Sequence, residues 1–213
     1  QCRMTLKYTN NSPANITEMT VTLVDEANLL RFEAAAGPTS LSGLATGTQV
    51  FMMECMKPAS PGPLLAVSYK DSLLGKHNNK VPVPVISTTF NEPLPQPAES
   101  FMSRWQQLSA PGQEAMEVIN VSYPLQPAMI RQAMTAMLKF AAIANIPGSS
   151  DFVLYGAASL RTGAMSPAGE KINVGCLVKI EINLQVNALR VTIRALHPAA
   201  SSAMLATVKS LLM

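Results

Sequence analysis

The hydrophobic pattern of this chain changes its period at one place, a proline-rich segment over residues 91–97 with the sequence Asn-Glu-Pro-Leu-Pro-Gln-Pro. Before this segment, apolar and polar residues alternate in short runs, as they do in β-strands; after it, apolar residues first recur at steps of three and four, as on a helix. Closely spaced prolines favour extended backbone and discourage free bending. The segment therefore predicts a joint between two domains, which we place at 1–93 and 94–213.

The first predicted domain consists of short strands separated by turn residues. Alternation places strands at residues 3–8, 17–24, 29–33, 48–54, 64–69 and 81–86. Asn-Asn, Gly-Pro and Pro-Gly-Pro segments lie between them, and no helical period interrupts them. Pro82 and Pro84 alternate in the last run, which suits an edge strand because proline lacks the N–H of a sheet ladder. This pattern is typical of an antiparallel β-sandwich of immunoglobulin type.

The second predicted domain mixes helices with a small sheet. Residues 98–108 carry a helical apolar face, a second helix is expected to begin at Pro127 and continue to Pro147, and a last helix opens at Pro198. Strands are expected at 152–160, 174–182 and 189–196. Helices clustered around a short antiparallel sheet make an α+β domain, called the platform below.

Composition and charge exclude several classes of protein. Hydrophobic residues make up 48% of the 213 residues and charged residues 14%, so the chain can build a core and is not disordered as a whole. No apolar run is long enough to span a membrane, and the N-terminus lacks a signal-peptide layout. The absence of a starting Met leads us to expect an excised fragment. The net charge of +3 is too small, and the charged residues are too scattered, for the clustered basic residues of a nucleic-acid-binding surface. The excess of positive charge lies after residue 93, where the chain has nine basic and six acidic residues.

The sequence contains no familiar catalytic or metal-binding pattern. The chain has no GxSxG turn, phosphate-binding glycine loop or HExxH helix, and its two histidines have no carboxylate or nucleophile at a meaningful spacing. The three cysteines form no CxxC pair, which argues against a disulfide scaffold or a zinc site. We therefore expect neither a catalytic residue, nor a metal, nor a cofactor.

The second domain carries a charged sheet face and the only Trp of the chain. Along strand 189–196 the residues Leu, Val and Ile alternate inward, so Arg190 and Arg194 project from the opposite face, about 13–14 Å apart. Lys179 and Glu181 should share that face from the preceding strand. The charged side chains would also point outward on any half-exposed sheet, and Trp105 could equally be an ordinary core residue. Together, however, an aromatic anchor at Trp105 and nearby cations suit a peptide with Phe or Trp flanked by Asp. The residues alone indicate a two-domain interaction module.

Three segments in combination resemble a known family. Residues 101–108 (FMSRWQQL), 175–185 (GCLVKIEINLQ) and 189–194 (LRVTIR) are similar in order, spacing and residue type to the C-terminal appendage, or ear, of alpha-adaptin. A weaker similarity runs through residues 65–76. The resemblance implies an immunoglobulin-like sandwich followed by a platform, within the large subunit of the plasma-membrane clathrin adaptor protein complex 2. It also implies recruitment of endocytic accessory proteins through DPF, DPW and FxDxF motifs, contact with other adaptor subunits through the rest of the parent chain, no nucleic acid and no membrane insertion. The location implied is cytoplasmic, at plasma-membrane clathrin-coated pits and vesicles.

The resemblance also suggests roles for individual residues. Trp105 resembles the aromatic wall of the motif pocket, Glu114 its acidic rim, and Arg190 and Arg194 the cations that meet the ligand's Asp and backbone. Lys179 stands where the family has Arg, so the charge is kept but the planar two-pronged fork is lost.

Two further departures from the family bear on specificity. Met102 replaces a Phe, which exchanges a rigid ring for a flexible thioether that loosens or broadens motif selection. The family's second site, on the sandwich, binds WxxF motifs; its aromatic aligns with Lys7 and its Gln lies within residues 46–49, so we expect that site to be absent or altered. The alternatives are the ear of a beta-adaptin or of the coatomer gamma subunit, with other partners, and an enzyme with an unrecognised site.

Overall fold

The computed structural model describes residues 1–58, 62–83 and 87–212. The chain folds into two compact units, of which the first contains Gln1–Lys57 and Gly62–Val85 and the second contains Ile86–Met213. Each unit has its own set of sheets and its own buried residues.

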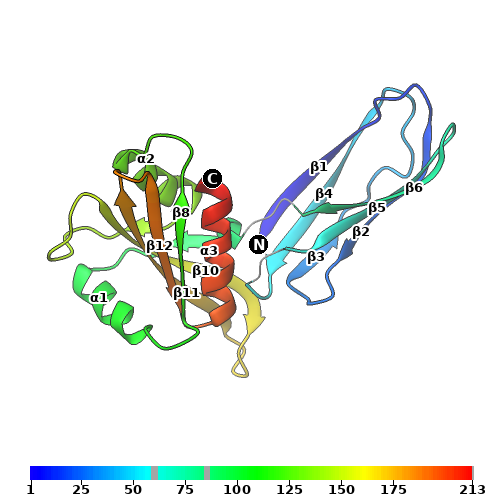
Figure 1. Ribbon diagram of the computed structural model, residues 1–213. Helices are drawn as coiled ribbons and strands as arrows, with labels where there is room; N and C mark the ends of the chain where they lie inside the picture. Colours follow the sequence, from blue (N-terminus) through cyan, green and yellow to red (C-terminus); the bar gives the residue numbers. More distant parts are fainter. Residues whose placement is uncertain (59–61, 84–86, 213) are drawn as a thin grey trace. The chain divides into compact units, whose positions relative to one another are not determined.

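The first unit is built from two three-stranded antiparallel sheets (Figure 1). One has the order β1 (Cys2–Thr9), β4 (Thr46–Cys55), β3 (Leu30–Ala34), and the other the order β2 (Ile16–Val24), β5 (Leu64–Asp71), β6 (Gly75–Pro82). Side chains from both sheets are fully buried, among them Phe51 and Met53 on β4 and Leu65 on β5. This sandwich-like layout agrees with the prediction for this half of the chain, and the five predicted strands up to residue 69 are confirmed within a few residues.

The sixth predicted strand is misplaced. β6 begins at Gly75, well before the predicted run at 81–86, and Pro84 and Ile86 lie outside the described residues. β6 lies at the edge of its sheet, and its residues are mostly exposed, which is why it lacks an apolar alternation that the sequence would reveal. A turn before it brings β5 and β6 together: the carboxylate of Asp71 accepts hydrogen bonds from the backbone of Leu73 and Leu74, and Gly75 takes a φ of 88°.

The second unit is a six-stranded antiparallel sheet with helices on both faces (Figure 1). Its strand order is β7 (Asn91–Pro93), β10 (Val153–Met165), β11 (Lys171–Asn183), β12 (Ala188–Ala195), β8 (Glu114–Asn120), and β9 (Ala141–Ala142) also pairs with β10. The helical elements are η1 (Ser87–Phe90), α1 (Ala98–Gln107), α2 (Pro127–Gln132), its π-helical continuation η2 (Ala133–Met137), and α3 (Pro198–Leu212). This is the α+β architecture expected from the sequence.

Alternation along the strands sends neighbouring residues to opposite faces of this sheet. On one face α3 packs against β8 and β12, and Lys209 of α3 forms an ion pair with Glu117 of β8. On the other face α1 packs its buried Phe101 against Ala157 of β10 and Leu177 of β11. The α1 side of the sheet also carries the charged residues predicted to form a site.

Two expectations about the edges of the platform need correction. Residues 91–93 pair with β10 as strand β7, so the first part of the proline-rich segment already belongs to the second unit, and the predicted boundary at 93 lies too late. The helix that begins at Pro127 ends at Met137 instead of reaching Pro147, because Lys139 takes a left-handed φ of 56° and β9 then joins the sheet.

The sequence did not indicate strand β8, because apolar residues lie on both of its faces and a carboxylate lies on the covered one. Met116 and Val118 are 55% and 58% exposed, whereas Ile119 is buried and Glu117 pairs with Lys209 of α3. Such a strand lacks the alternation of apolar and polar residues that marks a half-buried strand.

Candidate functional site

Trp105 lies on α1, half-buried beside the sheet. Its ring stacks on Phe101, with ring centroids 5.7 Å apart and an angle of 18° between the planes, and Tyr155 of β10 meets Phe101 edge-on at 5.6 Å. The four-residue spacing of Phe101 and Trp105 places both on one side of the helix, so the buried Phe anchors the more exposed Trp. The Trp105 side chain is thus packed against Phe101 on one side and still partly exposed to solvent.

Arg194 of β12 joins Trp105 to the edge strand β8. Its guanidinium lies 4.4 Å from the centroid of the Trp105 ring and donates a hydrogen bond to the Trp105 carbonyl oxygen. Its Nε and Nη2 atoms lie 2.7 and 2.6 Å from Oε2 of Glu114, which stands directly opposite Arg194 in the β12–β8 ladder. The structure therefore brings together three of the residues predicted for the site: Trp105, Glu114 and Arg194.

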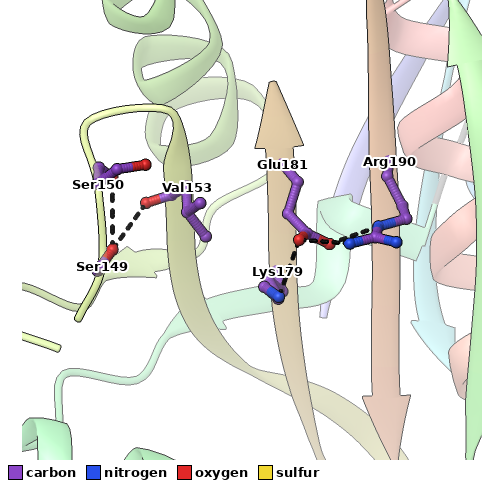
Figure 2. A network of polar contacts seen from close by, with 6 residues as sticks. All are labelled: Ser149, Ser150, Val153, Lys179, Glu181 and Arg190. Carbon is purple, nitrogen blue, oxygen red and sulfur yellow. Dashed lines mark hydrogen bonds and ion pairs between the residues drawn. The ribbon is translucent and has the colours of Figure 1, made fainter. Parts of the chain in front are cut away.

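Arg190, Glu181 and Lys179 form a second cluster on the same face (Figure 2). Arg190 donates from Nε and Nη2 to the two carboxylate oxygens of Glu181, each at 2.6 Å, and the Nζ atom of Lys179 lies 3.0 Å from Oε1 of the same carboxylate. Glu181 and Arg190 face each other across the β11–β12 ladder, so the register of the hairpin creates the pair.

The pairing holds both partners in their charged states. The hydrogen bond from Arg190, assisted by Lys179, lowers the pKa of Glu181 below its ordinary value of 4.5, although partial burial opposes this shift. The same hydrogen bond raises the pKa of Arg190. Both groups stay ionised near neutral pH, which suits electrostatic binding and does not suit proton transfer.

The two clusters lie along one line of the sheet. Arg190 and Arg194 point the same way on β12, about 13–14 Å apart at the rise of a strand. Alternation in the sequence predicts a cationic face of Lys179, Arg190 and Arg194 with one acidic neighbour, Glu181. In the structure these three cations face two carboxylates, Glu114 and Glu181, so the local excess is three minus two, or one positive charge.

Other residues around Trp105 act as support. Met102, predicted as a site residue, is half-buried and packs against the same apolar cluster as Trp105, which includes Phe101 and Ile143. From the sequence, Phe101 belongs to a helical stripe and to the segment 101–108 that resembles the family, but it is not among the predicted site residues, and neither is Tyr155. The signal available for Phe101 was its position four residues before the Trp; nothing in the sequence marked Tyr155.

The described part of the chain contains no cluster of three His, Cys, Asp or Glu side chains arranged to hold a metal ion. Cys55 and Cys176 are buried, and burial raises the pKa of their thiols to about 11 and about 12, so neither is a reactive thiolate at neutral pH. Within the same residues, no helix combines the length and the apolar character needed to cross a bilayer.

The second unit thus combines a sheet-and-helix platform with a half-buried Trp beside cations that are paired with carboxylates. Residues 89–212 match the family described as alpha adaptin AP2, C-terminal domain, and this match covers more than half of the chain. The chain belongs to this family of adaptin appendage domains, which are non-catalytic interaction modules of vesicle adaptors.

Among solved structures, the secreted serine protease VesC from Vibrio cholerae is similar to 93% of this chain, with a TM-score of 0.35 and 9% sequence identity. The similar region spans 43% of the VesC chain. At this TM-score the similarity carries no conclusion about fold or activity.

Proposed function

We propose that the α1 face of the second unit binds short peptide segments in which Phe or Trp lies beside Asp, of the DPF, DPW or FxDxF kind. The ligands are disordered segments of endocytic accessory proteins, and the protein acts as the appendage of an alpha-adaptin at plasma-membrane clathrin-coated pits, on the cytoplasmic side. Other adaptor subunits associate through the remainder of the parent chain. The observation that supports this most directly is the arrangement of Trp105 and Arg194, an aromatic ring and a cation in contact on a partly open surface.

The chemistry of this face matches such a ligand. An aromatic side chain of the peptide packs against the exposed part of Trp105, and the Asp carboxylate reaches Arg194 or Arg190. Arg190 uses Nε and Nη2 for Glu181, and its Nη1 group has further N–H donors directed elsewhere in the fixed guanidinium fork. A peptide carboxylate can therefore add to the pair without displacing Glu181.

Each contact of this kind is weak because a four- or five-residue motif buries little surface, and repeated motifs compensate through effective concentration. Added salt should weaken binding moderately, because Lys179, Arg190 and Arg194 are within reach of solvent and their attraction is screened.

The single Trp of the chain gives a direct test. A synthetic peptide with the sequence pattern FxDxF, which contains no Trp, should change the fluorescence of Trp105 on titration. Calorimetry with the same peptide should give binding that weakens about tenfold or more in Trp105→Ala, as expected for an aromatic anchor, and in a peptide with Asn in place of Asp.

Tyr69→Ala, which removes an aromatic ring from the first unit, serves as the matched control and should bind like the wild type. Trp105→Phe retains a ring on Phe101 and should keep part of the affinity, which guards against a folding defect in the alanine variant. Equal binding by the wild type and Trp105→Ala would exclude the proposal.

A pull-down from cell extract separates this proposal from the related appendages. Recovery of endocytic accessory proteins supports it, whereas recovery of coatomer-associated proteins alone would favour a coatomer-type appendage. Lys7, which replaces the family's aromatic on the sandwich, is exposed on β1 opposite Thr48. A WxxF peptide should accordingly show no binding to the first unit.

A further inference from the structure

Within the described part of the chain, the three most exposed large apolar side chains lie at one end of the first unit. Leu44, Leu73 and Leu74 are 72%, 74% and 77% exposed. Leu73 and Leu74 form the turn between β5 and β6, and Leu44 lies in the loop before β4. At this end β1 and β5 finish and β2, β4 and β6 begin (Figure 1). We call these three side chains, with the loops that carry them, the leucine tip.

Asn15, just before β2, joins the two loops of the leucine tip. Its backbone carbonyl accepts a hydrogen bond of 3.2 Å from the N–H of Ser72, and its side-chain oxygen accepts one of 3.1 Å from the N–H of Gly43. Leu73 directly follows Ser72, and Leu44 directly follows Gly43. The two loops therefore present their leucines on either side of one residue.

The backbone of both loops is fixed by bonds that do not need leucine side chains. The carboxylate of Asp71 accepts from the N–H groups of Leu73 and Leu74, and the N–H of Leu44 donates to the carbonyl of Ser12 at 3.0 Å. Leu44 also takes a φ of 60°, a left-handed conformation that Gly or Asn adopts at lower cost. Leucine at position 44 thus costs backbone free energy and gains no packing in exchange.

Two lysines lie just behind the leucine tip. Lys70 and Lys76 stand directly opposite each other in the β5–β6 ladder, both exposed, and like charges in this position repel. The carboxylate of Glu18 lies 3.5 Å from the Nζ atom of Lys70, with both side chains more than half exposed, so this ion pair is weak. The carboxylate of Asp71 is buried and held by the turn. An anion beside Lys70 and Lys76 would relieve their repulsion.

The order of these groups matches the layers of an anionic lipid bilayer. The lysines precede or follow the leucines by two or three residues, which is about 7–10 Å at the rise of a strand. Apolar side chains of proteins that lie on a membrane enter the boundary between headgroups and acyl chains by about 5–10 Å. Lysines set back by this distance reach the lipid phosphates, whose negative surface potential attracts them.

We infer that the leucine tip binds the surface of a bilayer that contains anionic lipids. Leu44, Leu73 and Leu74 enter the boundary layer, and Lys70 and Lys76 contact the phosphates above it. The family resemblance implies no insertion into a membrane, and the inference departs from that expectation for these three side chains alone. It is independent of the peptide site proposed on the second unit.

Flotation of the whole chain with lipid vesicles tests the inference. The probes are vesicles of phosphatidylcholine, either alone or with about one-fifth phosphatidylserine. The wild type should float with the anionic vesicles. The double variant Leu73→Ser and Leu74→Ser should bind them about tenfold or more weakly, because two large apolar side chains no longer leave water. The double variant Lys70→Gln and Lys76→Gln should weaken binding to the anionic vesicles to a similar extent, at about fivefold for each charge removed.

The second unit provides a matched control. Leu184→Ser and Leu196→Ser remove two other exposed leucines and should float like the wild type. Binding of an FxDxF peptide should be the same in the wild type and in both tip variants. Thermal unfolding of the leucine variant should also match that of the wild type, because the replaced side chains are exposed.

A tryptophan at the tip distinguishes insertion from attraction by charge alone. Trp105 is the only Trp of the chain, so Leu73→Trp combined with Trp105→Phe leaves a single fluorophore in the β5–β6 turn. Its emission should move to shorter wavelength when anionic vesicles are added, and bromine-labelled acyl chains should quench it.

Three results would overturn the inference. The first is a wild type that does not float with the anionic vesicles. The second is a leucine variant that floats as well as the wild type, or a tip Trp whose emission stays unchanged in the bound state, since charge alone would then account for binding. The third comes from sedimentation velocity: self-association of the wild type that the leucine variant abolishes, without vesicle binding, would identify a second copy of the chain as the occupant.

Discussion

Arg194 satisfies an aromatic ring, a backbone carbonyl and a carboxylate at once, whereas Arg190 is bound to a single carboxylate. Arg194 is also the more buried of the two, with 16% of its side chain exposed against 52% for Arg190. We therefore expect the two arginines to have different roles. Arg194 holds Trp105 and Glu114 in position, and Arg190 supplies a positive charge that a ligand can reach.

The pKa of Glu181 should report the strength of its pairing. In Arg190→Gln the largest cause of the shift is removed, so the pKa of Glu181 should rise from its lowered value toward 4.5. Since the folded-state pKa is depressed, the pairing contributes stability above the ordinary pKa, and this contribution is lost as the pH falls through the lowered value. Titration of the Glu181 carboxyl carbon by NMR measures the change, and Arg161→Gln, on the distant end of β10, should leave it unaltered. A midpoint that does not move would contradict the paired geometry.

Lys179 is the residue at which the proposed motif binding should be easiest to improve. Lys179→Arg restores a planar fork with five donors, so binding of an FxDxF peptide should strengthen by roughly threefold to tenfold, consistent with one improved charge-assisted hydrogen bond. Lys76→Arg on the exposed edge of the first unit makes the same chemical change away from the site. Calorimetry on both variants tests this, and equal affinities would show that the ligand does not reach position 179.

At the scale of elements, two glycines on neighbouring strands should behave differently when replaced by alanine. A Cβ on Gly156 of β10 would lie 3.0 Å from side-chain atoms of Phe140 and Val178 and 3.1 Å from the sulfur of Met134, whereas a Cβ on Gly175 of β11 would meet nothing within 4 Å. Gly156→Ala should lower the free energy of unfolding by about 1–3 kcal/mol through overpacking. Gly175→Ala should be neutral or slightly stabilising, because it restricts the unfolded chain. Urea unfolding of the two variants makes the comparison, and equal effects would contradict the packing described for β10.

The elements with regular amphipathic patterns could be predicted from the sequence, and those without could not. α1, α3 and the strands at 153–165, 171–183 and 188–195 bury one side, which leaves a periodic signal. β6 and β8 are edge strands in which apolar and polar residues do not alternate regularly between the two faces. The helix ends at Met137 because Lys139 adopts a left-handed backbone conformation. Contacts between elements distant in the sequence determine these two strands and this helix end, and such contacts cannot be read from a single sequence.

The same distinction applies to the candidate site. Alternation alone correctly placed Arg190, Arg194 and Lys179 on one face. The partners of these cations were beyond prediction, because Arg190 meets Glu181 only in the observed hairpin register and Glu114 lies on the unpredicted strand β8. The groove lined by Val118, Phe152, Leu184 and Val186 could not be predicted for the same reason, since its walls come from segments far apart in the sequence.

At the scale of the whole molecule, the second unit should function without the first. It contains its own core, the complete sheet from β7 to β12, and every residue placed around Trp105 and in the cluster of Lys179, Glu181 and Arg190. A chain of residues 87–213 should therefore unfold in one cooperative transition and bind an FxDxF peptide within about twofold of the full chain, as for an independent domain. Thermal unfolding and calorimetry test this. Loss of cooperativity, or much weaker binding, would show that the first unit is needed to form the site.

The pairing of site cations with Glu114 and Glu181 also has a kinetic consequence. Because the positive charges are largely balanced before a ligand arrives, the face exerts little long-range pull on acidic segments, and association should proceed near the unsteered rate constant of about 10⁵–10⁶ M⁻¹ s⁻¹. A segment with a dissociation constant of about 1 µM then leaves in roughly one to ten seconds, and a weaker one leaves sooner. We expect bound segments to exchange within seconds, so that many competing segments can occupy the one site in succession. Polyanions without an aromatic side chain should bind poorly, because the site offers little net positive charge.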